Sequence, residues 1–208
     1  MSATPPGYFD AVYAAGPDPW GSQRWYERRK RALLLAALPQ ERYRRAVEPG
    51  CGPGLLTAAL AARCDAVDAV ERSEVAAAAA RAATAHLPGV RVRTGVVPQD
   101  WPDGGYDLAV LSEVGYYTGA AGWTALLDRA VAGLEPLGTL VAVHWRHPAP
   151  DHVTSGDAVH AVLDARPDLA AVSRTVEGDL LLTVCLRAPA GTPGLSVAVR
   201  TGVPGAAR

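Results

Sequence analysis

An acidic residue followed by alternating glycines is the first pattern in this sequence that can do chemistry. Glu48 precedes Gly50, Gly52 and Gly54 in the stretch VEPGCGPG. Glycines admit a ligand close to the backbone because they carry no Cβ atom. The spacing G-x-G-x-G differs from the G-x-G-x-x-G of dinucleotide-binding loops, and this stretch lacks the Gly-Lys-Ser/Thr of a P-loop. Glu48 would repel a phosphate, so the loop favours a ligand with a positively charged end.

The loop lies between a predicted strand and a predicted helix, and this unit repeats along the chain. Short apolar runs predict buried strands, while apolar residues spaced by three and four predict helices. The predicted strands cover residues 46–48, 67–73, 90–95, 106–114 and 138–145. The predicted helices cover residues 22–38, 55–63, 74–87, 123–134 and 155–165, with Ser22 and Ser155 as N-caps. Two final runs, 169–176 and 180–187, predict a hairpin because a glycine-containing turn joins them.

This order of elements predicts an α/β fold. We expect a Rossmann-like, doubly wound, mostly parallel seven-stranded sheet with a C-terminal antiparallel hairpin. No regular spacing of apolar residues extends beyond residue 188. We therefore expect a single domain over residues 1–188, with an N-terminal cap helix near residues 22–38. Residues 189–208 are rich in glycine, proline and alanine and predict a flexible tail. Ligands of such sheets bind beyond the carboxyl ends of the strands, where the glycine loop falls.

Composition and charge favour a small-molecule partner. The 208 residues carry a formal net charge of −1, which offers no basic surface for nucleic acid. The sequence contains neither a membrane-span-length apolar run nor a secretory signal pattern. Its three cysteines, Cys51, Cys64 and Cys185, have no pairing or metal-ligand spacing. We therefore expect a cytoplasmic protein that binds no membrane and no metal.

The acid and the G-x-G-x-G loop after the first strand resemble the first motif of class I S-adenosylmethionine-dependent methyltransferases. A narrower resemblance, to the nodulation protein S (NodS) family, covers most of residues 8–187. It rests on the stretches YFDAVYAAGPDPWGSQRWYERRK, SEVGYY and SGDAVHAVL. Members of that family N-methylate an amino sugar at the end of a deacetylated chitin-type oligosaccharide. The resemblance implies S-adenosyl-L-methionine as cofactor and a small-molecule acceptor such as an amino sugar.

The resemblance also implies how the cofactor binds. The backbone at Gly50 and Gly52 would lie against the methionine portion, and Glu48 would face its ammonium group through water. Glu71 ends the second strand, where a carboxylate can accept both ribose hydroxyls.

The loop after the third strand would hold the adenine ring. The resemblance implies that Asp100 accepts a hydrogen bond from the adenine amino group and that Trp101 packs against the face of the ring. Val97 is a lesser candidate for contact with the adenine. A place in the core fits Trp101 equally well.

The N-terminal helix would cover the cofactor cleft. One helical stripe contains Trp25, Arg29, Ala32 and Ala36. We expect Arg29 to bind the cofactor carboxylate and Trp20, of the DPW stretch, to form an aromatic wall.

Methyl transfer requires a nucleophile aligned about 3 Å from the sulfonium methyl and shielded from water. An amine attacks only when deprotonated, and a carboxylate or imidazole can take its proton. Glu113 is the preferred candidate, because a charge directly after an apolar strand is costly unless it faces a cleft. His144, which ends the fifth strand, is the second, although a neutral hydrogen-bonding role fits it equally. The carbonyl of Ser112 would face the cofactor ammonium.

Other functions stay open at this point. O-methylation of a small secondary metabolite is the nearest, followed by a non-catalytic protein that binds S-adenosylmethionine. A nicotinamide-dependent oxidoreductase would share the sheet, although the glycine spacing and Glu48 count against it. Several polar and aromatic residues fit either an acceptor pocket or capping, packing and surface roles: Tyr116, Tyr117, His152, Asp157 and His160.

Overall fold

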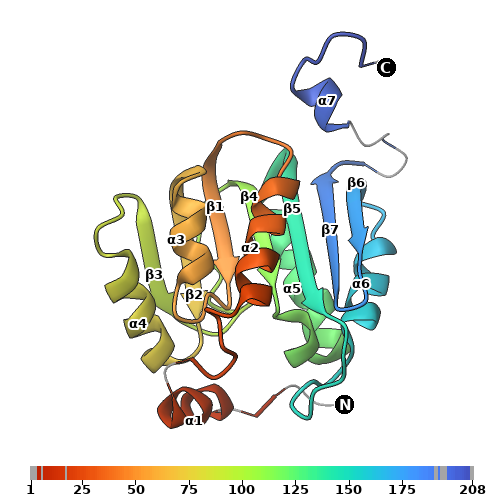
Figure 1. The fold of residues 1–208 in the computed structure, drawn as a ribbon. Coiled ribbons are helices and arrows are strands. Elements are labelled where there is room, and N and C mark those ends of the chain that lie inside the picture. The colour runs from red at the N-terminus through yellow and green to blue at the C-terminus, as the bar shows by residue number, and fades with distance from the viewer. Residues whose placement is uncertain (1–3, 6, 17, 190–191, 193–195, 207–208) are drawn as a thin grey trace.

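Seven strands form one sheet: β1 (Tyr43–Pro49), β2 (Cys64–Glu71), β3 (Val90–Thr94), β4 (Tyr106–Ser112), β5 (Leu134–Trp145), β6 (Leu169–Val176) and β7 (Leu180–Arg187). The computed structural model describes residues 4–5, 7–16, 18–189, 192 and 196–206. The strand order is β3-β2-β1-β4-β5-β7-β6 (Figure 1). Strands β1 to β5 pair in parallel, whereas β7 is antiparallel to both of its neighbours. The predicted fold class is therefore confirmed.

Helices cover both faces of the sheet. The helical elements are α1 (Tyr8–Ala15), α2 (Trp25–Ala37), α3 (Leu55–Ala61), α4 (Glu74–Thr84), the 3₁₀ turn η1 (Gly115–Tyr117), α5 (Gly119–Gly133), α6 (Gly156–Asp164) and α7 (Val197–Arg200). Figure 1 shows α2, α3 and α4 on one face and α5 and α6 on the other, while α1 lies beyond the carboxyl ends of the parallel strands.

The strands form where the chain buries side chains on both faces. In β4, Leu108 and Val110 pack with residues of α2 and α3, whereas Ala109 and Leu111 pack with residues of α5. Alternate residues of a strand point to opposite faces, so a strand buried on both faces is apolar throughout. This is why a continuous apolar run correctly predicted a central strand.

The predicted elements differ from the structure mainly at their ends. Strands β1, β2 and β5 begin three to four residues earlier than predicted. Ser155 caps α6, since its hydroxyl accepts a hydrogen bond from the Ala158 N–H at 3.1 Å. Ser22 does not cap α2: its hydroxyl donates to Asp18, and Arg24 occupies the N-cap position. The sequence did not predict α1, because proline and glycine surround it.

The predicted tail contains one helical turn, α7, at residues 197–200. Residues 190–191, 193–195 and 207–208 of that tail lie outside the described residues. Among the helices that the structure describes, none is long and apolar enough to cross a membrane.

The large side chain of Trp123 is buried between α5 and the sheet, and it also forms a hydrogen bond with α6. It is almost fully buried, and its indole N–H donates to the Val159 carbonyl at 2.9 Å. We expect Trp123→Ala to lower the free energy of unfolding by about 3–5 kcal/mol, because it leaves a cavity in the core. Trp123→Phe should cost less, since it keeps most of the apolar contact. Urea denaturation followed by circular dichroism measures both, with Val176→Ala on the exposed edge strand as the control. Equal stability of all three variants would contradict this assignment.

Candidate active site

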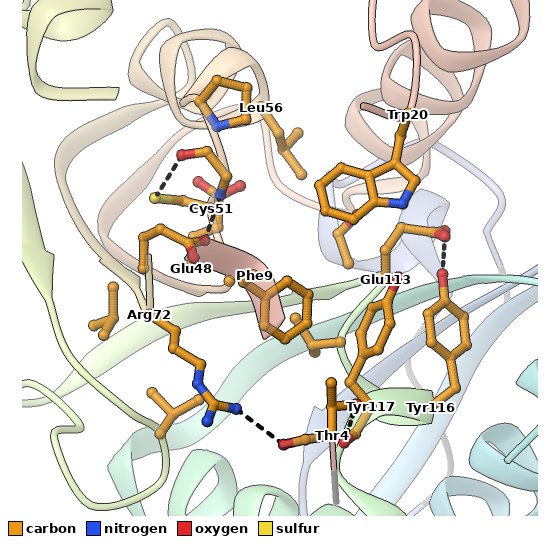
Figure 2. A pocket seen from close by; sticks show the side chains of 18 of the residues that line it. Thr4, Phe9, Trp20, Glu48, Cys51, Leu56, Arg72, Glu113, Tyr116 and Tyr117 are labelled. Atoms are coloured by element: carbon orange, nitrogen blue, oxygen red, sulfur yellow. Dashed lines mark hydrogen bonds between the residues drawn. The ribbon is translucent and has the colours of Figure 1, made fainter. Parts of the chain in front are cut away.

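A cavity of about 1050 Å³ lies at the carboxyl edge of the parallel strands. Strand order reverses between β1 and β4, which is the point where open α/β sheets bind ligands. The volume is at the upper end of the range for small-molecule sites. Figure 2 shows Glu48 and Cys51 on one side of this cavity and Glu113 and Tyr116 on the other, with Phe9 between them in that view.

The glycine loop forms one wall with a backbone that only glycine adopts easily. Gly50 and Gly52 have φ values of 69° and 53°, in the left-handed region. A Cβ atom on Gly52 would lie 2.8 Å from the Tyr13 hydroxyl, and one on Gly50 would overlap the Val114 side chain. Both glycines line the cavity. A side chain at either position would therefore clash with the protein itself, so this path of the loop requires glycine at both.

Glu48 is a buried carboxyl group at the end of β1. It lines the cavity and is only 2% exposed. The Thr57 hydroxyl of α3 donates a hydrogen bond to its Oε2 at 2.7 Å. Burial raises the pKa of Glu48 to about 8, against the lowering effect of Thr57. A cation brought beside this group would favour its charged form.

Glu71 ends β2 and faces the same loop. The Gly52 N–H donates to its Oε2 and the Ser73 N–H to its Oε1, both at 2.8 Å. Burial raises the pKa of Glu71, while these backbone donors lower it. The two donors fix the carboxylate at the cavity wall, where each oxygen retains capacity to accept a further hydrogen bond.

The loop after β3 lines the cavity with residues 95–99, which include Val97. Asp100 is not placed as predicted, and Trp101 takes the core position that was its alternative. The Asp100 carboxylate turns back on its own loop and accepts from the Val96 N–H at 2.7 Å. Trp101 packs into the core of the α5 face. The lesser candidate, Val97, is therefore the one of these three that faces the cavity.

Helix α2 covers the cavity, but with a different face from the one predicted. Lys30 and Leu34 are buried, and Tyr26 lies on the same stripe. Trp25, which starts the predicted stripe, is 69% exposed. The helix is rotated because Leu34 fits the core beneath it, and the aliphatic stem of Lys30 can be buried while its ammonium reaches anionic partners.

This rotation changes which basic residue meets the cavity. Arg29 forms a two-pronged ion pair with Glu177 of the β6–β7 turn, with N···O distances of 2.7 and 2.8 Å, and lies outside the lining. Lys30 and Arg31 line the cavity instead. One nitrogen of Arg31 donates to the Ser22 carbonyl at 2.9 Å, which leaves its other donors available.

Helix α1 and Trp20 form an aromatic roof. Trp20 lines the cavity as predicted, and its ring lies 5.3 Å from that of Tyr13 and 6.5 Å from that of Phe9. Sequence reasoning missed Phe9 and Tyr13. Their spacing of four residues, which places them on one helical face, was the available signal.

Glu113 follows β4 and has an unusual backbone for a non-glycine residue, with φ of 60°. This conformation is costly and is typical of functional sites. The Tyr116 hydroxyl donates to its Oε2, and the Lys30 ammonium lies 3.2 Å from its Oε1. Burial raises the pKa of Glu113, whereas Lys30 lowers it. Both Glu113 and the preceding Ser112 line the cavity.

His144 lies behind this wall and is fully buried. Its Nε2 accepts from the Gly115 N–H at 3.0 Å, so its proton is on Nδ1, which faces Nε2 of His160 at 3.2 Å. His160 then donates from Nδ1 to the Thr183 hydroxyl at 2.9 Å. Burial keeps the pKa of His144 well below its usual range. Both ring nitrogens are engaged, so His144 is not placed as predicted for a base and matches the neutral alternative.

The wall around Glu113 is aromatic and polar. The rings of Tyr116 and His152 stack with centroids 3.7 Å apart. Asp151 accepts from the Tyr8 hydroxyl at 2.9 Å. Within the described residues, no group of three or more His, Cys, Asp or Glu side chains is arranged to hold a metal ion.

Comparison with known proteins links this chain to methyltransferases. A family model for a methyltransferase domain matches residues 46–138. A structure from Pseudomonas syringae, assigned as a methyltransferase, has 46% identity and a TM-score of 0.71, and the match covers 79% of this chain and 100% of that one. The N-methyltransferase NodS of Bradyrhizobium japonicum WM9, in complex with S-adenosyl-L-homocysteine, has 25% identity and a TM-score of 0.74, with coverage of 86% and 98%. A search of curated protein sequences finds no match.

Burial of Glu48 makes the stability of the protein depend on pH. Its pKa is raised from 4.5 to about 8 in the folded state, so the folded protein holds this proton more tightly than the unfolded chain. The resulting stabilisation is complete below about pH 4.5 and is lost as the pH rises toward 8. We expect Glu48→Gln, which cannot ionise, to gain stability relative to the original protein between pH 5 and pH 8. Thermal melts of both proteins across this range measure the difference, and parallel curves would contradict the prediction.

Proposed function

The chain belongs to the class I S-adenosylmethionine-dependent methyltransferases, and on this premise we propose that it methylates the amine of a small polar acceptor, in particular an amino sugar or deacetylated saccharide. The observation that carries the proposal is the carboxylate of Glu113 at the cavity wall, with Glu27 close by. An acidic wall favours a cationic acceptor such as an ammonium group. The likeness to NodS, an N-methyltransferase, supports the same acceptor class.

The residues on the β1 side of the cavity fit the methionine portion of the cofactor. Gly50 and Gly52 have a left-handed backbone and line the cavity, which suits a ligand held close to the main chain. Glu48 is a buried acid whose only hydrogen-bond donor in the described structure is the Thr57 hydroxyl, and it would face the ammonium group. S-adenosylmethionine supplies a methyl group bound to a positively charged sulfur. When this methyl group is transferred, the electrons of the carbon–sulfur bond stay on sulfur.

The adenosine portion would extend toward β2 and β3. We propose that Glu71 accepts the ribose hydroxyls, since two backbone N–H groups already hold its carboxylate in place. Val97 and its neighbours would pack against the adenine ring. Trp20 would close the site from above. Asp100 would act only by shaping this loop through its hydrogen bond to Val96.

The acceptor would lie beside Glu113. Its ammonium group first loses a proton to the carboxylate, which becomes neutral, and the free amine then forms the new nitrogen–carbon bond. Lys30 and Tyr116 hold Glu113 in position for this proton transfer. The nearby roof of Trp20 and Phe9 would exclude water from the reacting groups. His144 would contribute by fixing the backbone at Gly115.

Acceptor chemistry tests this proposal directly. We expect the protein, incubated with S-adenosylmethionine, to methylate glucosamine or a deacetylated chitin oligosaccharide and to leave the N-acetylated forms unchanged, since these lack a free amine. Mass spectrometry of the products measures the transfer. Glu113→Gln should lower the rate with the amine by roughly 10²–10⁴-fold, the usual contribution of a general base.

The matched N-acetylated saccharides also separate the alternatives. Methylation of both forms would assign the reaction to a hydroxyl group, as an O-methyltransferase would perform it. Binding of S-adenosylmethionine without a product from either saccharide would reject the amino-sugar acceptor. An unchanged turnover rate in Glu113→Gln would show that Glu113 is not the base of the reaction.

Two arginines of α2, Arg29 and Arg31, provide a second test. We propose that Arg31, which lines the cavity, binds the cofactor carboxylate in place of the predicted Arg29. Arg31→Met should weaken binding of S-adenosylhomocysteine by about 10–100-fold, because it removes a charge-assisted hydrogen bond. Arg29→Met, which removes only the surface pair with Glu177, should change the affinity less than about twofold. Isothermal titration calorimetry of the two variants decides between them, and the reverse order of affinities would restore Arg29.

A further inference from the structure

Lys30 is a buried cation held between two carboxylates. It is 5% exposed, and its ammonium lies 2.9 Å from Oε1 of Glu27 and 3.2 Å from Oε1 of Glu113. Lysine is almost never buried to this degree unless its charge is paired. The proposed function uses the carboxylate of Glu113, but it does not explain why a lysine should lie beside it.

The three charges connect two distant parts of the chain. Glu27 and Lys30 are one turn apart on α2, whereas Glu113 follows β4. All three residues line the cavity, and with both carboxyl groups ionised they carry one net negative charge together. Lys30 therefore attracts Glu113 while Glu27 competes for the same ammonium group.

We propose that Lys30 is a positioning residue for methyl transfer, which keeps the Glu113 carboxylate ionised and directed into the cavity, while Glu27 limits this attraction so that Glu113 can still accept a proton. The role of Glu113 as base rests on the proposed function. The electrostatic coupling of the three residues does not, because it follows from their distances. The single net negative charge suits an acceptor that arrives with one positive charge.

Other groups around Glu113 act on the same carboxylate. The titratable groups that face it come from α2 and η1 and are Tyr26, Glu27, Lys30, Tyr116 and Tyr117. Burial raises the pKa of Glu113; Lys30 and the Tyr116 hydroxyl lower it, and Glu27 raises it. Removing Lys30 and removing Glu27 should therefore shift the titration of Glu113 in opposite directions. Loss of packing alone, with no change of charge near Glu113, would not shift the titration in opposite directions in the two variants.

The titration of Glu113 can be measured without an acceptor or a cofactor. The full chain is labelled with ¹³C at the glutamate carboxyl groups and titrated by NMR, and Glu113→Gln identifies the resonance by its loss. We expect Lys30→Met to raise the midpoint of Glu113 by about 1–3 pH units, the usual effect of losing a close opposite charge. Lys30→Arg should restore most of the original midpoint. Glu27→Gln should lower the midpoint.

Arg29→Met is the matched control, since it removes a neighbouring charge that pairs with Glu177. It should leave the midpoint of Glu113 unchanged. Circular dichroism shows whether Lys30→Met folds. If it does not, the difference in the Glu113 midpoint between Glu27→Gln and the original protein still measures the electrostatic coupling within this group of charges. A midpoint that is the same in the original protein, Glu27→Gln and any folded Lys30→Met variant would overturn the proposal.

The failure of this proposal is distinct from failure of the proposed function. An inactive Glu113→Gln enzyme with an unshifted titration in the Lys30 and Glu27 variants overturns only the role of Lys30. An active Glu113→Gln enzyme removes the base, and with it the positioning role, even if the titration shifts as expected.

Discussion

Pairing between β1 and β4 is the contact on which the site depends. Ala46 and Val47 of β1 pair with Leu108 and Ala109 of β4, so the two strands end side by side. The chain then leaves β1 toward α3 on one face of the sheet and leaves β4 toward η1 and α5 on the other (Figure 1). The two connections diverge and leave an opening between them. Glu48 near the end of β1 and Glu113 after β4 lie on opposite sides of this opening.

Residues at strand ends were the part of the site that the sequence predicted well. A buried strand is apolar along most of its length, so its end is visible as the first charged residue after the apolar run. Glu48, Glu71 and Glu113 follow this rule, and all three line the cavity. Their positions depend only on the length of a strand and on the common direction of parallel strands. The roles assigned to them remain predictions.

Positions set by helix rotation or by a loop path were predicted less well. Each residue of a helix turns by about 100°, so Arg29 and Arg31, which are two positions apart, point to different sides of α2, and of the two only Arg31 lines the cavity. The aliphatic residues of α2 could pack on the sheet with either of two helix faces. Sequence patterns treat lysine as a polar residue, although the stem of Lys30 is buried here. In the loop after β3 no period exists, and Asp100 serves its own backbone. Such contacts arise only when distant parts of the chain meet.

The N-terminal segment bridges the two sides of the cavity. Tyr13 lies against Gly52 of the glycine loop, Tyr8 donates to Asp151 near the Glu113 wall, and the Thr4 N–H donates to the Tyr117 carbonyl at 3.0 Å. One short stretch of chain therefore contacts both halves of the cavity. The same few residues at the start of the chain therefore bound the glycine loop on one side and the surroundings of Glu113 on the other, so both walls of the cavity share one boundary.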